Sequence, residues 1–164
     1  RRLSSAASDV YKRQVLGARP SSADFALFGQ LTQLCQVEPT SYKVARHRPR
    51  VRAWVDRLED LSGLEVEDDA WLAANEVGPA LAPLLGEVGR VYAPCLIANA
   101  NAIASGEPTF ETQIDGKVWT QDVFPYQAKC LAEIRAAYEA LDASAQAQVS
   151  EWFAGTGCEA LISE

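Results

Sequence analysis

The sequence of 164 residues predicts a mainly α-helical protein with one small β-hairpin at about residues 109–122. Five segments repeat apolar residues three and four positions apart, which is typical of helices that pack one face on a core. One segment instead alternates apolar and polar residues around Asp115-Gly116, which is typical of a hairpin. With 48% hydrophobic and 23% charged residues, the composition predicts a folded chain with a buried core.

The first helix is predicted from Ser21 to about Gln36, where Pro39 ends it because proline cannot continue the backbone hydrogen bonding. Residues 42–47 add a short turn of helix. The second helix begins near Pro49, a residue favoured in the first turn, and ends at residues 62–63. Residues 64–78 are acidic and irregular, and we expect them to cover the core, since Trp71 needs burial.

The third helix is the longest and runs from about Pro79 to Ser105, with a kink expected at Pro94. The hairpin follows, with Asp115-Gly116 suited to a type I′ turn. Its register pairs Ile114 with Lys117, Thr112 with Trp119, and Phe110 with Gln121. Phe110, Ile114 and Trp119 then share one face, and we expect that face to dock on a helix because an isolated hairpin is marginal in water.

Two further helices are predicted near the end of the sequence. One runs from about Pro125 to Leu141, and the other follows Asp142 or Ser144 as its cap. Gly155 and residue 157 close the second. We expect residues 64–164 to form a helical extension with the hairpin, docked on the helices of residues 15–63.

Residues 1–14 read RRLSSAASDVYKRQ and show no helical or alternating period. They are predicted to be a non-native or disordered tail and are excluded from the fold. The chain also begins with Arg and contains no Met, so we expect it to be part of a longer protein.

The most specific local signal begins at Gly17 and includes Ser21 and Asp24. Ser21 can cap the helix by accepting from the Asp24 backbone N–H, while Asp24 accepts from the Ser21 N–H, a capping box. The pattern of Gly, three residues, Ser, two residues and Asp resembles the start of a core helix in the C-terminal all-helical domain of glutathione S-transferases. The segment from Pro49 is similar to the next helix of that family, and Pro20 departs from the aliphatic residue that is common there.

The resemblance covers residues 15 to about 63 and implies a helical wall of an acceptor-substrate pocket. In the family, a thioredoxin-like N-terminal domain binds glutathione as co-substrate and supplies the thiol-activating residue, so no catalytic or cofactor-binding residue is assigned to this chain. The implied partners are that domain, a small electrophilic substrate and a second copy in a homodimer. The alternative is a non-catalytic module of the same fold that binds other proteins.

Other features favour structural roles. The cysteines at 35, 95, 130 and 158 show no Cys-x-x-Cys spacing, and we expect free thiols in the cytoplasm, with Cys158 the most exposed. His47 lies between two arginines, so no metal site is predicted on it. The net charge of −7 argues against nucleic acid as a partner, and no uninterrupted apolar run approaches the about 20 residues of a membrane span.

A polar pocket is a second possibility on the third and fourth helices. Asn99 lies in the apolar face of the third helix, so it is either satisfied by a neighbouring backbone or faces a pocket. Tyr92 lies two turns earlier on that face. Tyr126 and Lys129 share a face at the start of the fourth helix, where Lys129 could hold an anion or simply pack on the tyrosine at the surface.

Overall fold

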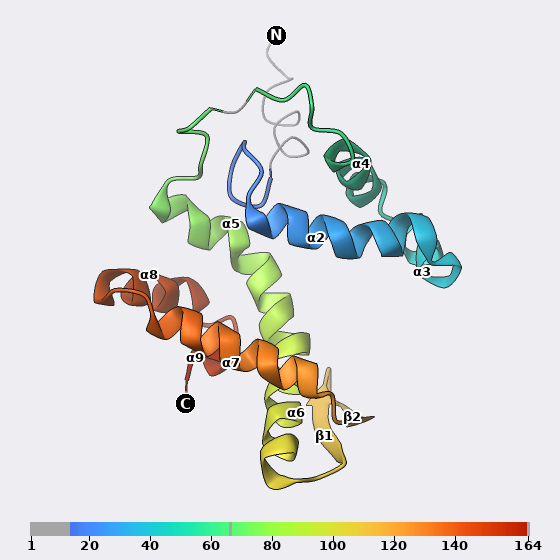
Figure 1. Cartoon of the computed structure of the whole chain (residues 1–164), viewed down its shortest axis with the longest axis vertical. Helices are drawn as coiled ribbons and strands as arrows, with labels where there is room; N and C mark the ends of the chain where they lie inside the picture. The colour runs from blue at the N-terminus through green and yellow to red at the C-terminus, as the bar shows by residue number, and fades with distance from the viewer. Residues whose placement is uncertain (1–13, 66, 164) are drawn as a thin grey trace. The chain divides into compact units, whose positions relative to one another are not determined.

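The computed structural model describes residues 14–65 and 67–163, and it is mainly helical with one two-stranded antiparallel sheet (Figure 1). Its contacts divide the chain into two compact units, one ending at Ala73 and one beginning at Ala74. The sequence placed this boundary after residue 63. The difference arises because residues 70–72 pair with the segment that precedes the first described helix.

Over residues 14–65 and 67–73, the first unit forms the helices α2 (Ser22–Thr32), α3 (Pro39–Ala45) and α4 (Pro49–Leu58). A π-helical turn, η1 (Gln33–Val37), continues α2. Pro39 and Pro49 each occupy the first turn of a helix, where a missing N–H costs no hydrogen bond. Cys35, Ala45 and Val55 form the buried centre of this unit.

Residues 14–18 and 70–72 lie side by side in the first unit. The Ala18 N–H donates to the Ala70 carbonyl at 2.8 Å, and the Leu72 N–H donates to the Leu16 carbonyl at 2.8 Å. Gly17 has a φ of 140°, and a Cβ placed on it would lie 2.4 Å from the Ala70 oxygen. Only glycine therefore fits at this crossing.

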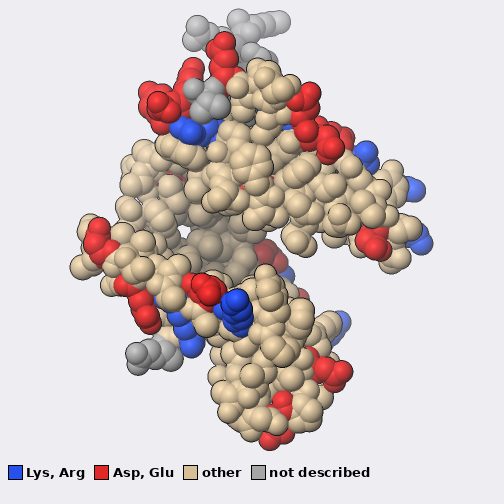
Figure 2. Space-filling model, in the orientation of Figure 1, with Lys and Arg blue, Asp and Glu red and all other residues tan. Residues whose placement is uncertain are grey.

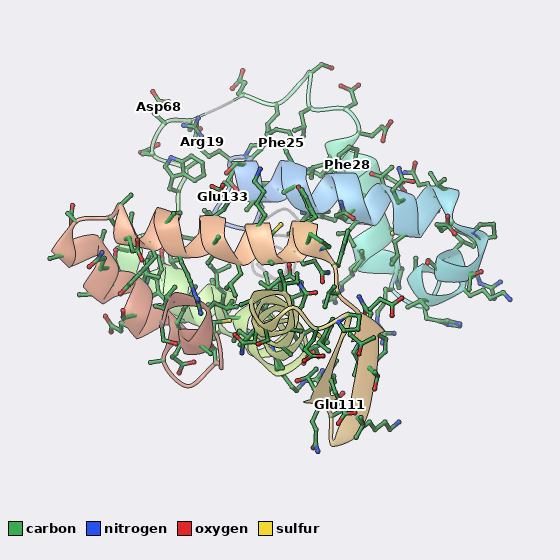
Figure 3. The ribbon with its side chains drawn as sticks, turned by 60° about the horizontal axis from the view of Figure 1, so that its bottom comes forward. Arg19, Phe25, Phe28, Asp68, Glu111 and Glu133 are labelled. Carbon is green, nitrogen blue, oxygen red and sulfur yellow. The ribbon has the colours of Figure 1, made fainter. Side chains whose placement is uncertain are left out.

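Trp71 is less covered than the sequence predicted. Its side chain is 43% exposed, and the Arg19 guanidinium lies 4.7 Å from the ring centre. Arg19 also pairs with Asp68 at 3.2 Å (Figure 3). The Trp71 ring is therefore not buried in a core. The backbone of Trp71 pairs with Gly17, and the Arg19 guanidinium lies over the face of the ring.

The predicted tail of residues 1–14 is wrong at its last residue. Gln14 is 6% exposed; its N–H donates to the Gly17 carbonyl at 2.8 Å, and its side chain accepts from the Trp54 indole at 3.1 Å. Residues 1–13 lie outside the described part of the chain. The folded part therefore includes Gln14, whose amide makes a polar contact that an apolar periodicity cannot reveal.

The second unit begins with one long helical stretch of three parts. These are α5 (Ala74–Glu87), the π-helical turn η2 (Val88–Tyr92) and α6 (Ala93–Ser105). The stretch starts at Ala74, five residues before the start predicted at Pro79. Pro79 therefore lies inside α5. At η2 the Ala93 N–H donates to the Val88 carbonyl, five residues back, and this local unwinding places Pro94 in the first turn of α6.

By length and composition alone, the 32-residue stretch Ala74–Ser105 is apolar enough to cross a membrane, with a mean hydropathy of 1.3 in its 18-residue window. The sequence expectation of no such segment overlooked it because it counted only uninterrupted apolar runs. Core helices that pass the same test are mostly buried, whereas 17% of this window is buried. The buried residues of α6 are Ala93, Leu96 and Asn99.

The hairpin consists of β1 (Thr109–Ile114) and β2 (Lys117–Asp122), and its predicted register is confirmed. Asp115 and Gly116 both have positive φ values, 53° and 71°, as a type I′ turn requires. The predicted docking face is wrong in part. Phe110 is buried, but Trp119 is 48% exposed, because β1 is the strand that packs on α6.

The rest of the unit comprises α7 (Pro125–Glu139), α8 (Ala143–Phe153) and a short α9 (Glu159–Ile162) that the sequence did not predict. Asp142 is the cap of α8 and accepts from the Ala145 N–H at 2.8 Å. The buried core gathers residues from α6, α7 and the C-terminal segment: Ala93, Leu96, Leu131, Cys158 and Leu161.

The loop between α8 and α9 packs directly against η2. A Cβ placed on Gly89 would lie 2.0 Å from the Thr156 oxygen, and the facing Gly157 has a φ of 86°. Cys158 follows this contact and is fully buried, with its Sγ 3.2 Å from the Leu85 carbonyl. The prediction of an exposed Cys158 is therefore wrong, because the two glycines bring the backbones close enough to enclose the thiol.

Candidate functional site

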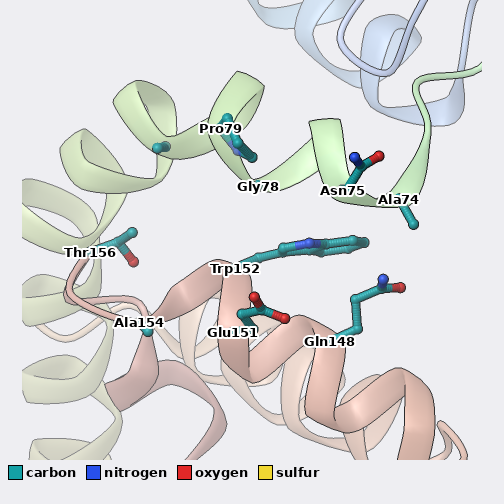
Figure 4. Close-up of a pocket in the computed structure, with 10 residues that line it drawn as sticks. Ala74, Asn75, Gly78, Pro79, Gln148, Glu151, Trp152, Ala154 and Thr156 are labelled. Atoms are coloured by element: carbon teal, nitrogen blue, oxygen red, sulfur yellow. The ribbon is translucent and has the colours of Figure 1, made fainter.

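The second unit contains an open cleft of about 530 Å³ between α5 and α8 (Figure 4). One wall comes from the first turns of α5 and the other from the end of α8 and the residues after it. The lining residues are mostly small, apart from one tryptophan and three long or polar side chains. They are Ala74, Asn75, Gly78, Pro79, Ala82, Gln148, Glu151, Trp152, Ala154 and Thr156.

Trp152 is the only aromatic residue of the cleft, and its indole lies between the two walls. Gly78 allows this position, since a Cβ placed there would lie 2.8 Å from Trp152 Cδ1. The absence of a side chain at Gly78 thus lets the ring lie directly against α5. The Trp152 side chain is half-buried, so part of the ring remains open to the cleft.

Besides Thr156, three polar side chains line the cleft: Asn75 from α5, and Gln148 and Glu151 from α8. Within residues 14–65 and 67–163, none of the three makes a side-chain hydrogen bond to another residue. Glu151 is the only charged residue among the ten that line the cleft. The site therefore offers one carboxylate and two amides to a ligand.

Of the side chains that can take part in acid–base or nucleophilic chemistry, the cleft lining holds one carboxylate, Glu151, and one hydroxyl, Thr156. Its lining includes no Cys, His, Lys or Tyr. Thr156 carries its only hydroxyl, which donates to the Phe153 carbonyl at 2.6 Å and accepts from the Cys158 N–H at 3.2 Å. Both hydrogen bonds of that hydroxyl lie within residues 153–158 and stabilise the loop between α8 and α9.

The structure resolves the two readings of Asn99 in favour of backbone bonding. Asn99 is fully buried; its Nδ2 donates to the Phe124 carbonyl at 3.0 Å, and its Oδ1 accepts from the Phe124 N–H at 2.7 Å. The amide satisfies both backbone groups of the residue that precedes α7. Asn99 thus fixes where α7 begins, and both polar atoms of its side chain are hydrogen-bonded to Phe124.

The other candidates of that predicted pocket lie at the surface. Tyr92 is 40% exposed, and partial burial, with a smaller effect of Cys130, raises its pKa. Tyr126 is 66% exposed and contacts the Phe124 ring, with ring centres 6.2 Å apart. Lys129 is exposed one turn later. None of these residues lines the α5–α8 cleft.

The capping box predicted at Ser21 and Asp24 is present. Ser21 N and Ser21 Oγ donate to Asp24 Oδ2 at 2.8 and 2.6 Å, and the Asp24 N–H donates to Ser21 Oγ at 3.4 Å. Asp24 Oδ1 also accepts from the Val15 N–H at 2.8 Å. Asp24 is fully buried, so the box anchors the segment before α2 as well as the helix itself.

The cysteines are structural in their surroundings. Cys35 and Cys158 are buried, Cys95 and Cys130 are half-buried, and all four are free thiols. Burial raises the pKa of Cys95, which disfavours its reactive thiolate. Over residues 14–65 and 67–163, no group of three His, Cys, Asp or Glu side chains could hold a metal ion.

Sequence reasoning missed the cleft because its walls are separated by about 70 positions, and its residues share no spacing. The sequence does carry one signal for the cleft. The first turns of α5 are rich in small residues, and one of them, Gly78, lies against the ring of Trp152 near the end of α8. Comparison with protein-family models, curated proteins and solved structures gives no significant match for this chain.

Proposed function

We propose that the chain is the C-terminal helical part of a glutathione S-transferase-like protein, where it forms a wall of the acceptor-substrate pocket. The observation that carries the proposal is the buried box of Ser21 and Asp24, four and seven residues after Gly17. The resemblance to the family lies in these three positions. The positive φ of Gly17 and the burial of Asp24 give each position a physical role.

In this proposal a thioredoxin-like domain of the longer protein binds glutathione and activates its thiol. The present chain contributes no catalytic residue and no cofactor ligand. Its helices shape the space for a small electrophilic substrate. The whole protein would be a cytoplasmic transferase that forms a homodimer.

The test is the conjugation of glutathione to chlorodinitrobenzene by the full-length protein that contains this chain. We expect turnover by the full-length protein and none by residues 14–164 alone. Retention of the full-length protein on immobilised glutathione provides an independent readout. A full-length protein that neither binds glutathione nor conjugates it would overturn the proposal.

The alternative, a non-catalytic module of the same fold, is favoured by a different observation. Four large apolar side chains near the hairpin are at least 48% exposed: Val118, Trp119, Phe124 and Tyr126. Exposed aromatic residues are enriched where proteins bind one another. This alternative predicts glutathione binding without turnover, or neither, together with a partner whose capture is lost in the Trp119→Ala variant.

A further inference from the structure

We propose that the α5–α8 cleft binds a flat organic cation with N–H donors, of the amidinium or aromatic-amine class. The cleft lies entirely within residues 74–156, outside the segment that resembles glutathione S-transferases. The inference therefore does not depend on the proposed function.

The charge of the lining selects a cation. Glu151 is the only charged residue around the cleft, and no Lys or Arg lines it. An anion would meet a carboxylate with no compensating positive side chain, which is unfavourable at close range. A neutral apolar ligand would offer no hydrogen bond to Glu151 or to the two amides.

The aromatic surface selects a flat ligand. Trp152 lies between the two walls of the cleft (Figure 4), and tryptophan is the side chain that attracts cations most strongly through its ring face. The ring already packs on α5 at Gly78, where a Cβ would lie 2.8 Å from Trp152 Cδ1. Binding then costs little ordering of that side chain, since the ring is positioned in advance.

The amides supply the hydrogen-bonding pattern. The side-chain oxygens of Asn75 and Gln148 are acceptors, and the two residues stand on opposite walls with the Trp152 indole between them (Figure 4). A ligand with several N–H groups that stacks on the α8 side of the ring can bond to Gln148 and Glu151, which are three positions apart on α8 and share a face. The cavity of about 530 Å³ falls in the range of sites for small organic molecules.

The experiment titrates the full chain with three ligands of the same shape and different charge. Benzamidinium is the cation, benzamide the neutral analogue and benzoate the anion. Calorimetry and shifts of the Trp152 indole NMR signal report binding. We expect saturable binding of benzamidinium, about tenfold weaker binding of benzamide, as for loss of one charged hydrogen bond, and no binding of benzoate.

Three variants of cleft residues and one control variant outside it test whether the binding occurs in the cleft. Glu151→Gln keeps the shape of the side chain and should weaken benzamidinium binding about tenfold, leaving benzamide unaffected. Trp152→Leu should weaken it about threefold, whereas Trp152→Phe should retain most of the affinity. Glu133→Gln removes the same charge from an exposed position on α7 (Figure 3) and should change nothing.

Equal affinities for benzamidinium and benzamide would overturn the proposal, as would no saturable benzamidinium binding at tens of millimolar, on the order of the weakest specific affinities. Equal effects of Glu151→Gln and Glu133→Gln would also overturn it, because they would show general attraction to an acidic chain. Loss of glutathione conjugation in the longer protein would leave these results unchanged, so the two proposals fail separately.

Discussion

Asp24 is a buried carboxylate whose two oxygens accept three hydrogen bonds, from Val15 N, Ser21 N and Ser21 Oγ. Replacing it by alanine would leave those donors without this acceptor at a buried position. We expect Asp24→Ala to lower the free energy of unfolding by about 1–2 kcal/mol. Chemical denaturation measures this loss.

Asp69→Ala is the matched control, since Asp69 is an exposed acid in the irregular segment of the same unit. Its denaturation midpoint should not move. An unchanged midpoint in Asp24→Ala would show that the box does not support the fold.

Asn99 stabilises the junction between the hairpin and α7 through both backbone groups of Phe124. Asn99→Ala should therefore cost about 1–3 kcal/mol, because the Phe124 N–H loses its acceptor and the Phe124 carbonyl loses one of two donors, the other being the Gln127 N–H. Denaturation gives the cost, and faster hydrogen exchange at the Phe124 amide localises it. Asn101→Ala, at an exposed position of α6, should leave both measurements unchanged; equal effects in the two variants would contradict the assignment.

For single residues, the sequence predicted hydrogen bonds between partners that lie close together in the chain. It did not predict contacts between residues that lie far apart in the chain. Ser21 and Asp24 are three positions apart, so their hydrogen bonds follow from helix geometry. Asn99 was recognised as a polar residue on an apolar face, but its partner lies 25 positions away. The burial of Cys158 depends on a contact with Leu85, 73 positions earlier, and no local pattern encodes it.

Among the elements, the π-helical turn η2 interrupts the helical stretch of residues 74–105 just before Pro94. Gly89 lies within η2 and faces the loop at Thr156 and Gly157. In Gly89→Ala the new Cβ meets backbone atoms, so we expect a loss of about 1–3 kcal/mol, as for overpacking of a core. Thermal and chemical denaturation measure it.

Gly86 provides the control for that variant. It belongs to the same helical stretch, and a Cβ placed on it meets nothing within 4 Å. Gly86→Ala should stabilise the protein by about 0.5–1 kcal/mol, because glycine loses more backbone freedom in a helix than alanine does. A similar effect of both substitutions would show that the loop is not seated on Gly89.

The hairpin turn is joined to η2 by an ion pair between Arg90 and Asp115. The hydrogen bond from Arg90 holds the pKa of Asp115 below its ordinary value of 3.8. Because this pKa is lowered by folding, the pair stabilises the protein above pH 4 and is lost as the pH falls through the folded-state pKa. An NMR titration of the Asp115 carboxyl should show a pKa below the ordinary value of 3.8. Arg90→Ala should raise this pKa, whereas Lys117→Ala should not.

The hairpin also shows why elements were predicted more reliably than their packing. The turn and register follow from Asp115-Gly116 and the alternation on either side. Which strand packs on α6 depends on the approach of a helix that the alternation does not encode, so the sequence buried Trp119 although it is exposed. The same limit applies to the cleft, whose walls are paired only by the fold.

For the whole molecule, each unit has a core of its own. Cys35, Ala45 and Val55 belong to the first unit. The larger cluster, which includes Leu96, Leu131 and Leu161, belongs entirely to the second. The sequence instead expected residues 64–164 to need the earlier helices as a surface on which to dock.

These cores lead to a test of that expectation. The second unit encloses apolar residues from α6, α7 and α9, caps α8 with Asp142 and fixes α7 through Asn99. A unit of about 90 residues with these features is within the size that folds alone. We therefore expect residues 74–164, expressed alone, to keep the helical circular dichroism of this segment and to unfold cooperatively in denaturant.

The Asn99→Ala substitution should destabilise this fragment as much as the full chain, because every partner of Asn99 is present in it. A fragment that is unfolded without denaturant would instead support docking on residues 15–63, and an effect of Asn99→Ala confined to the full chain would show that the isolated unit adopts another packing.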